Sequence, residues 1–159
     1  MSGIASEDRL FDDRVIELIE HAHSVRVDRS SIRRRVFLDG YEIDVIFTAY
    51  TEIRGLPRIF IVELKDRDIH KVLVQAIRRS IYAHYTYAII ARPHWDVVDY
   101  IIRYWKSLVP YISKSGIGII SYCKGYVDTV EYEPILIRPA KFNYNRIKTV
   151  LEYLVKNHA

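Results

Sequence analysis

The sequence predicts a mixed α/β domain in which helices cover a sheet. Three observations support this fold class: stripes of apolar residues with helical period, short apolar segments of strand length between them, and turn residues at the junctions. In chain order the expected elements are helix, three strands, helix, strand, helix, strand and helix. No internal repeat, low-complexity stretch or linker interrupts the 159 residues, so we expect a single domain over residues 1–159.

The N-terminal half begins with a predicted helix over residues 6–23. Ser6 is the expected N-cap, and Glu7 and Asp8 place acidic side chains in the first turn. An arginine-rich connection follows the helix. It leads to strands predicted at residues 35–38, 41–50 and 58–65, which are separated by a turn at Asp39-Gly40 and a loop over residues 51–57.

The C-terminal half alternates helices with short strands. Asp68 is the expected cap of a helix over residues 69–83, and an apolar strand follows at residues 85–91. Pro93 begins a helix to Leu108 whose expected inward residues are Val97, Val98, Ile101, Ile102, Trp105 and Leu108. Further strands are expected at residues 116–122 and 127–137. Asn143 or Asn145 can cap a last helix with Ile147, Val150, Leu151 and Leu154 inward.

Composition limits the classes of protein to which the chain can belong. Cys123 is the single cysteine, so an internal disulfide and a cysteine-based zinc or iron–sulfur site within one chain are excluded. No apolar run approaches the roughly 18 residues that cross a bilayer. The first residues are acidic and polar where a signal peptide would be basic and then apolar, so we expect an intracellular, cytoplasmic protein without membrane contact. Thirteen tyrosines and only six glycines indicate a thermophilic source.

Basic residues predict a polyanionic partner. The net charge is +4 and the isoelectric point is about 9.1. The positive charge is concentrated in two places, a run before and within the first predicted strand and one face of the 69–83 helix: Arg26, Arg29, Arg33, Arg34 and Arg35, then Lys71, Arg78 and Arg79. A solvated loop explains the first group equally well.

Charged residues also occupy strand positions where apolar side chains would normally pack. Because side chains alternate between the faces of a strand, Glu63 and Lys65 share the face of Ile61, and Asp44 shares the face of Ile46 on the preceding strand. If the hairpin register sets Asp44 opposite residue 63 or 65, two carboxylates lie close together on adjacent strands.

Such a pair of carboxylates needs a compensating charge. Two like charges about 4 Å apart repel by roughly 4 kcal/mol at an effective dielectric constant near 20. Lys65 offsets part of this repulsion, so either one carboxyl stays protonated or a divalent cation binds. Oxygen ligands without cysteine suit Mg²⁺ or Mn²⁺. A metal of this kind polarises a phosphate oxygen and lowers the pKa of a bound water, while Lys65 positions that water or stabilises the transition-state charge.

Three segments carry a resemblance to a known family. They are GYEIDVIF at residues 40–47, IVELK at residues 61–65 and HKVLVQA at residues 70–76. Together they resemble the PD-(D/E)XK nuclease superfamily, and among its members the archaeal Holliday-junction resolvases. The resemblance implies a restriction-endonuclease-like three-layer core of helix, three strands, helix and strand over about residues 6–91. Residues 92–159 would then be a C-terminal elaboration with extra strands and helices.

The resemblance also implies a role for each matching residue. Asp44 and Glu63 would be metal ligands, with the backbone carbonyl of Leu64 as the third. Lys65 would be the catalytic lysine, and Gln75 a helix residue near the site. The implied cofactor is Mg²⁺ or Mn²⁺.

Members of the superfamily often bring one more acid from the first helix. Glu7 is the best candidate, because it lies one turn before Phe11 at the edge of the apolar stripe, whereas Asp13 and Glu17 point away from that stripe. The sequence departs from the pattern at Ile43, which stands where many members have proline.

The activity implied by the resemblance is metal-dependent hydrolysis of phosphodiester bonds in nucleic acid, most readily DNA. The basic residues Arg29, Arg33, Arg34, Arg35, Lys71, Arg78 and Arg79 would hold phosphates. Structure-selective cleavage by a homodimer is compatible with the sequence, as is a restriction or repair nuclease. Two alternatives remain open: an inactive nuclease-fold protein acting as a nucleic-acid-binding or scaffolding subunit, and an interaction domain whose charges at 44, 63 and 65 form a structural ion-pair network.

Overall fold

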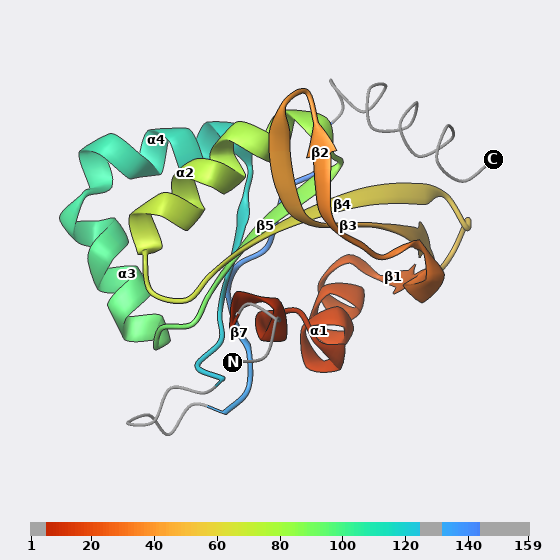
Figure 1. Cartoon of the computed structure of the whole chain (residues 1–159), viewed down its shortest axis with the longest axis horizontal. Coiled ribbons are helices and arrows are strands. Elements are labelled where there is room, and N and C mark those ends of the chain that lie inside the picture. The colour runs from red at the N-terminus through yellow and green to blue at the C-terminus, as the bar shows by residue number, and fades with distance from the viewer. Residues whose placement is uncertain (1–5, 125–131, 144–159) are drawn as a thin grey trace.

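A seven-stranded mixed sheet with helices on both faces forms the centre of the protein (Figure 1). The computed structural model describes residues 6–124 and 132–143. The strands follow the order β1-β3-β4-β5-β6-β7, and β2 also pairs with β3. Their bounds are β1 Val25–Val27, β2 Arg33–Leu38, β3 Tyr41–Thr51, β4 Pro57–Lys65, β5 Tyr85–Ile90, β6 Gly118–Ser121 and β7 Ile135–Arg138.

Four α-helices and three short 3-10 helices surround the sheet. They are η1 Ser6–Leu10, α1 Asp13–His23, η2 Arg29–Ser31, α2 Ile69–Arg79, η3 Ser80–Tyr82, α3 His94–Arg103 and α4 Trp105–Ser115. The helix α1 packs on one face of the sheet, and α2 and α4 pack on the other, where Val97 of α3 joins the same core. The mixed α/β fold class predicted from the sequence is therefore confirmed.

The pairing of the strands divides the sheet into two parts. β2, β3 and β4 are antiparallel neighbours, and β4, β5 and β6 are parallel. The turn between β2 and β3 needs the left-handed backbone of Asp39 and Gly40, whose φ angles are 51° and 78°. The helix α2 connects β4 to β5. Its N-cap is Asp68, as predicted, and the Asp68 side chain accepts a hydrogen bond from the Lys71 amide.

The predicted helix over residues 6–23 was wrong as a single element. Its first part is the 3-10 helix η1, and α1 begins only at Asp13. Asp12 is the N-cap, because its side chain accepts hydrogen bonds from the amides of Arg14 and Val15. Because the Asp12 side chain caps α1, the α-helix begins after it, and η1 is a separate element that ends at Leu10. The sequence also missed β1, because Val25–Val27 lies in the segment that we predicted to be a connection.

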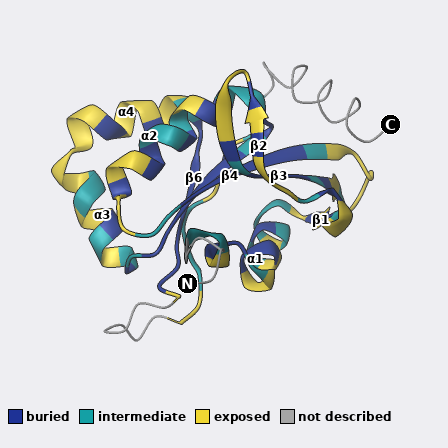
Figure 2. Cartoon of the chain, viewed as in Figure 1, coloured by how far each residue is buried: buried dark blue, intermediate teal, exposed yellow. Residues whose placement is uncertain are grey.

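The predicted helix over residues 93–108 was wrong in the same way. It divides at Tyr104 into α3 and α4. Val97 and Leu108 are buried as expected, but Ile102 and Trp105 are 63% and 57% exposed, and Val98 is 36% exposed. Figure 2 shows this outer face of α3 and α4 as mostly exposed. The break changes the direction of the helix axis, so a single stripe no longer continues across it.

Two C-terminal predictions extend past the part of the chain that the structure describes. Of the strands predicted over residues 127–137, β7 lies at Ile135–Arg138, and residues 127–131 are outside the described ranges. The last predicted helix, with Ile147, Val150, Leu151 and Leu154, also lies outside them. In residues 6–124 and 132–143, no helix has the length and apolar character required to span a membrane.

Candidate active site

Asp44 and Glu63 lie together where the pairing of β3 and β4 ends. The register pairs Val45 with Val62 and Ile46 with Ile61, so Asp44 continues the ladder opposite Glu63. The Asp44 amide donates a hydrogen bond to Glu63 Oε2 over 3.0 Å, and the Leu64 amide donates to Asp44 Oδ2 over 2.8 Å. Each carboxylate thus binds the backbone of the neighbouring strand, which fixes both groups at one point of the sheet.

The same hydrogen bonds orient the backbone of Leu64. Its amide points toward β3, and in an extended strand the carbonyl of a residue points to the same side as its amide. The Leu64 carbonyl therefore points from β4 toward β3, the strand that carries the Asp44 carboxylate. The Leu64 side chain is buried in the core under α1.

Glu63 is a buried carboxyl group in an unfavourable environment. Its side chain is 1% exposed. Burial, followed by the nearby Asp44 carboxylate, raises the pKa of Glu63 to about 8. Near neutral pH the group therefore retains its proton for much of the time. A cation that replaced this proton would compensate the negative charges of both acids.

Arg79 is the cation beside Glu63, and the prediction misplaced it. We expected this residue among exposed phosphate-binding groups, but its side chain is 11% exposed and Nε lies 2.8 Å from Glu63 Oε1. The Nε–H finds no hydrogen-bond acceptor among the described residues, so this contact is an ion pair without an aligned hydrogen bond. The guanidinium also lies over the Tyr41 ring, 5.0 Å from its centroid.

A sequence signal for Arg79 was present. The inward stripe of α2 comprises Ile69, Val72, Leu73 and Ala76, and its period continues to Arg79. A charged residue in an inward position is the same anomaly that identified Glu63. Gln75 lies one turn before Arg79 and is half-buried, and it is Arg79 that contacts the Glu63 carboxylate.

Lys65 and Glu7 form a second ion pair. Lys65 is the last residue of β4, and its Nζ lies 3.5 Å from Oε1 of Glu7 in η1. The predicted acid from the N-terminal segment is therefore next to the predicted catalytic lysine. Within residues 6–124 and 132–143, however, no three His, Cys, Asp or Glu side chains form a group that could hold a metal, so Glu7 does not join Asp44 and Glu63.

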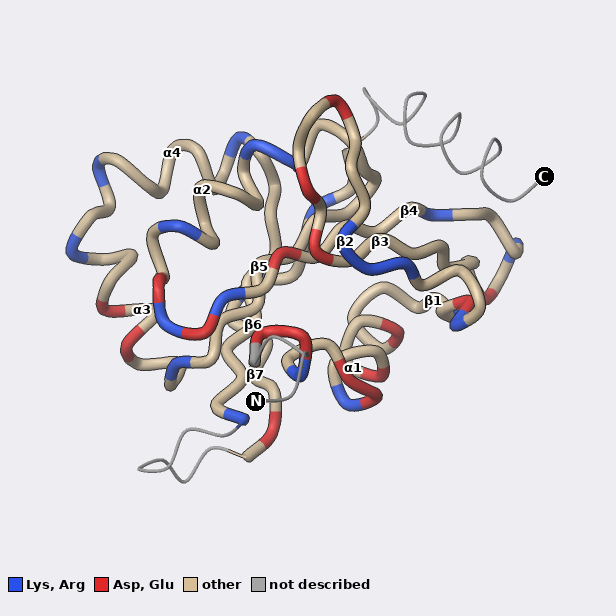
Figure 3. Tube along the Cα trace, in the orientation of Figure 1, with Lys and Arg blue, Asp and Glu red and all other residues tan. Residues whose placement is uncertain are grey.

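Each predicted phosphate-binding arginine of the first basic run has a partner within the protein, and for three of them it lies in residues 8–13. Arg29 pairs with Asp13 over 2.5 Å, and Arg35 pairs with Asp8 over 3.0 Å. Arg34 donates hydrogen bonds to the carbonyls of Asp8 and Phe11, and Arg33 donates to those of Ser30 and Ile32. Lys71 and Arg78 are exposed on α2. Figure 3 marks basic positions along β2 and α2 in blue.

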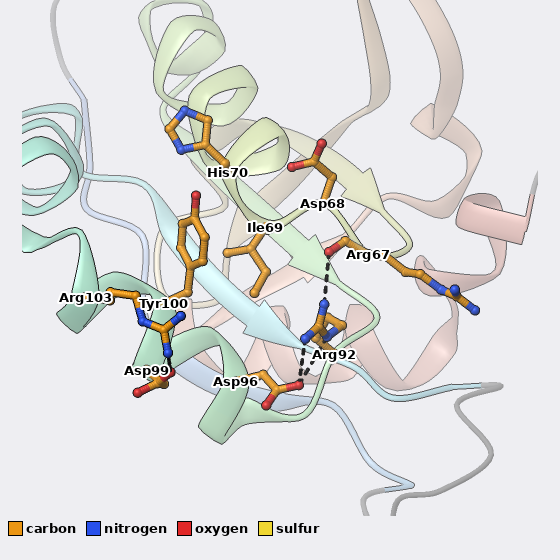
Figure 4. A pocket seen from close by; sticks show the side chains of 9 residues that line it. All are labelled: Arg67, Asp68, Ile69, His70, Arg92, Asp96, Asp99, Tyr100 and Arg103. Carbon is orange, nitrogen blue, oxygen red and sulfur yellow. Dashed lines mark hydrogen bonds and ion pairs between the residues drawn. The ribbon is translucent and has the colours of Figure 1, made fainter.

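A hollow of about 400 Å³ lies beyond the carboxyl ends of β4 and β5 (Figure 4). Its walls come from the loops that follow β4 and β5, the first turn of α2 and the helix α3. Arg92 pairs with Asp96 over 2.9 Å, and Arg103 pairs with Asp99 over 2.9 Å. Because these charges satisfy one another, the hollow presents a mixed polar surface close to the strand end that carries Lys65.

Neither a protein-family model nor a curated protein sequence matches this chain. The functional interpretation therefore depends on the geometry and chemistry of the site itself.

Proposed function

We propose that this protein is a metal-dependent nuclease of the PD-(D/E)XK type, which hydrolyses phosphodiester bonds in DNA. The observation that carries the proposal is the pairing of Asp44 with Glu63 across β3 and β4, two residues before Lys65. A restriction-endonuclease-like arrangement of the core is part of the same proposal. Its support is the order of η1 and α1, three antiparallel strands, α2 and the parallel strand β5.

The residues present fit Mg²⁺ or Mn²⁺. Both ions prefer oxygen ligands, and the site offers two carboxylates and the Leu64 carbonyl on one side of β4. Magnesium commonly binds through one or two protein carboxylates and completes its coordination with water and substrate phosphate. Asp44 and Glu63 would hold the ion, which when bound would activate water and stabilise negative charge on a phosphate.

The side chains of this protein contribute position and charge. Asp44 is held in place by the Leu64 amide, and Glu63 is held by the Asp44 amide, so neither carboxylate has to be ordered when substrate arrives. Lys65 is 21% exposed and can exchange its partner Glu7 for a phosphate oxygen. Its ammonium would then stabilise the charge that develops on the phosphate in the transition state.

The exposed cations beside the site would contact the DNA backbone. Lys71 and Arg78 are exposed on α2, the helix whose last residue, Arg79, contacts Glu63. Arg29 and Arg35 become available only if they leave Asp13 and Asp8. We therefore assign α2 the larger part of the phosphate contacts. Binding by these residues would weaken with added salt.

The decisive experiment is a cleavage assay with purified protein and Mg²⁺ or Mn²⁺. Branched, single-stranded and duplex DNA should be compared, since the substrate structure is unassigned. We expect Asp44→Asn and Lys65→Met to lower the cleavage rate by about 100-fold or more, because each removes charge from the reacting centre.

Lys114→Met is the matched control for Lys65→Met. Lys114 is an exposed lysine of α4 outside the site, so this variant should cleave at the wild-type rate. Absence of cleavage by the wild-type protein on all three substrates would refute the proposal. Equal rates for wild type and Lys65→Met would remove the lysine from it.

A second candidate function is supported by the two ion pairs. Arg79 neutralises Glu63, and Glu7 neutralises Lys65, so the charges have partners without any metal. On this alternative the protein is a nuclease-fold subunit that binds nucleic acid without cleaving it. It predicts DNA affinity that is unchanged by Mg²⁺ and by Asp44→Asn.

A further inference from the structure

The end of α2 places a positive charge against one of the two proposed metal ligands. Arg79 is the last residue of the helix, and its Nε lies 2.8 Å from Glu63 Oε1. The other oxygen of the same carboxylate, Oε2, accepts the hydrogen bond from the Asp44 amide. Glu63 therefore faces an internal cation on one oxygen and the Asp44 backbone on the other.

We propose that Arg79 is an internal counter-ion that competes with a divalent cation for Glu63 and thereby sets the metal affinity of the site. This inference rests on the proposed function, because it concerns the same two carboxylates. Arg79 acts through Glu63 and is a positioning residue.

The guanidinium is held loosely enough to give way. Its Nε–H has no hydrogen-bond acceptor among the described residues, and Nη2 reaches the Glu42 carbonyl only at 3.5 Å. The remaining contact is with the ring of Tyr41, at 5.0 Å from the centroid. A bidentate arginine–carboxylate pair would hold both groups more firmly than the one-oxygen contact between Arg79 and Glu63 does.

The charges of the other site residues do not take over this role. Lys65 is paired with Glu7, so Arg79 is the cation that faces Glu63 in the described part of the chain. A divalent ion bound between Asp44 and Glu63 would lie close to the guanidinium, and the two cations would repel one another. Loss of the charge at residue 79 removes this repulsion. Removal of the Arg79 charge favours binding of a divalent ion at Glu63 more than binding of a proton, because the ion carries twice the charge.

Calorimetric titration of the whole protein with Mn²⁺ at slightly alkaline pH tests the inference. Arg79→Met keeps most of the side-chain length and removes the charge, and we expect it to bind Mn²⁺ about tenfold or more tightly than wild type. Arg79→Lys keeps the charge and should stay close to wild type. Arg54→Met is the matched control, since it removes the same charge from an exposed position in the turn between β3 and β4, away from the site.

The outcomes separate the inference from the proposed function. Wild-type binding that Asp44→Asn abolishes, combined with equal or weaker binding by Arg79→Met, overturns the inference and leaves the metal site standing. Equal gains in Arg79→Met and Arg54→Met also overturn it, because they show a general effect of net charge. Absence of Mn²⁺ binding by every variant overturns both proposals. If Arg79→Met fails to fold, Arg79→Gln replaces it, because its amide can donate a hydrogen bond to Glu63.

Discussion

The two ends of β4 bury titratable groups in opposite ways. At the first end, the Ile59 amide donates a hydrogen bond to Nδ1 of His84 over 2.7 Å, and nearby His23 bonds to the Tyr87 hydroxyl. Burial lowers the pKa of both histidines to about 4, so both are neutral near physiological pH. At the second end, Glu63 and Arg79 are buried with Asp44 beside them, and burial and the Asp44 carboxylate make it costly to ionise Glu63.

The proposed function accounts for this difference between the two ends. A neutral histidine that accepts one amide hydrogen bond completes the local structure and leaves no charge to compensate. A buried pair of carboxylates with one loosely held arginine adds little stability compared with apolar residues of the same size. Residues that the fold does not need for stability are the ones that a binding or catalytic role explains.

The largest expected effect comes from breaking the charged end. At a pH above the Glu63 pKa of about 8, we expect Arg79→Ala to lower the free energy of unfolding by about 3 kcal/mol, because the ionised Glu63 would stay buried beside Asp44 without its cation. Urea denaturation followed by circular dichroism measures the change. The double variant Glu63→Gln/Arg79→Ala should recover part of the loss. A double variant that loses the sum of both single effects would contradict the coupling.

A smaller loss is expected at the neutral end. His84→Ala leaves the Ile59 amide buried without an acceptor, which should lower the free energy of unfolding by roughly 1–3 kcal/mol. The same denaturation experiment applies, with His21→Ala as the control because His21 is exposed on α1. Equal stability of the two variants would show that the His84 hydrogen bond is unimportant.

The smallest expected effect is a difference in how the groups at the two ends of β4 make the free energy of unfolding depend on pH. Glu63 has a pKa of about 8 in the folded protein against 4.5 ordinarily, so the folded state binds its proton more tightly and stability falls as the pH rises through that window. The histidines act in the opposite direction, since their pKa values of about 4 against 6.5 reduce stability as the pH falls from 6.5 to 4. Between pH 6.5 and 8, therefore, the Glu63 effect dominates.

Over this interval we expect the wild-type protein to lose on the order of 1 kcal/mol of unfolding free energy. Glu63→Gln removes this titration, so its stability should not fall over the interval and should rise slightly, because His23 and His84 still lose their protons in the unfolded state. Chemical denaturation of both proteins at the two pH values measures the difference. Parallel losses in wild type and variant would assign the dependence to another group.

Local patterns in the sequence were enough to predict most of the sheet and part of the site. Alternation of side chains placed Asp44 and Glu63 on adjacent strands, and the Asp68 cap correctly located the start of α2. The break at Tyr104 escaped prediction because both halves carry apolar residues at helical spacing, and only packing against the sheet separates them. The partner of Glu63 escaped because Arg79 lies 16 residues further along the chain and was grouped with its exposed neighbour Arg78.

The position of Arg79 at the end of α2 also constrains how this helix can evolve. Each residue added to or removed from a helix turns the side chains beyond it by about 100° around the axis. One insertion between Asp68 and Arg79 would carry the guanidinium away from Glu63 and bring a different side chain over the sheet. The eleven-residue length of α2 therefore sets the position of the Arg79 guanidinium relative to Glu63.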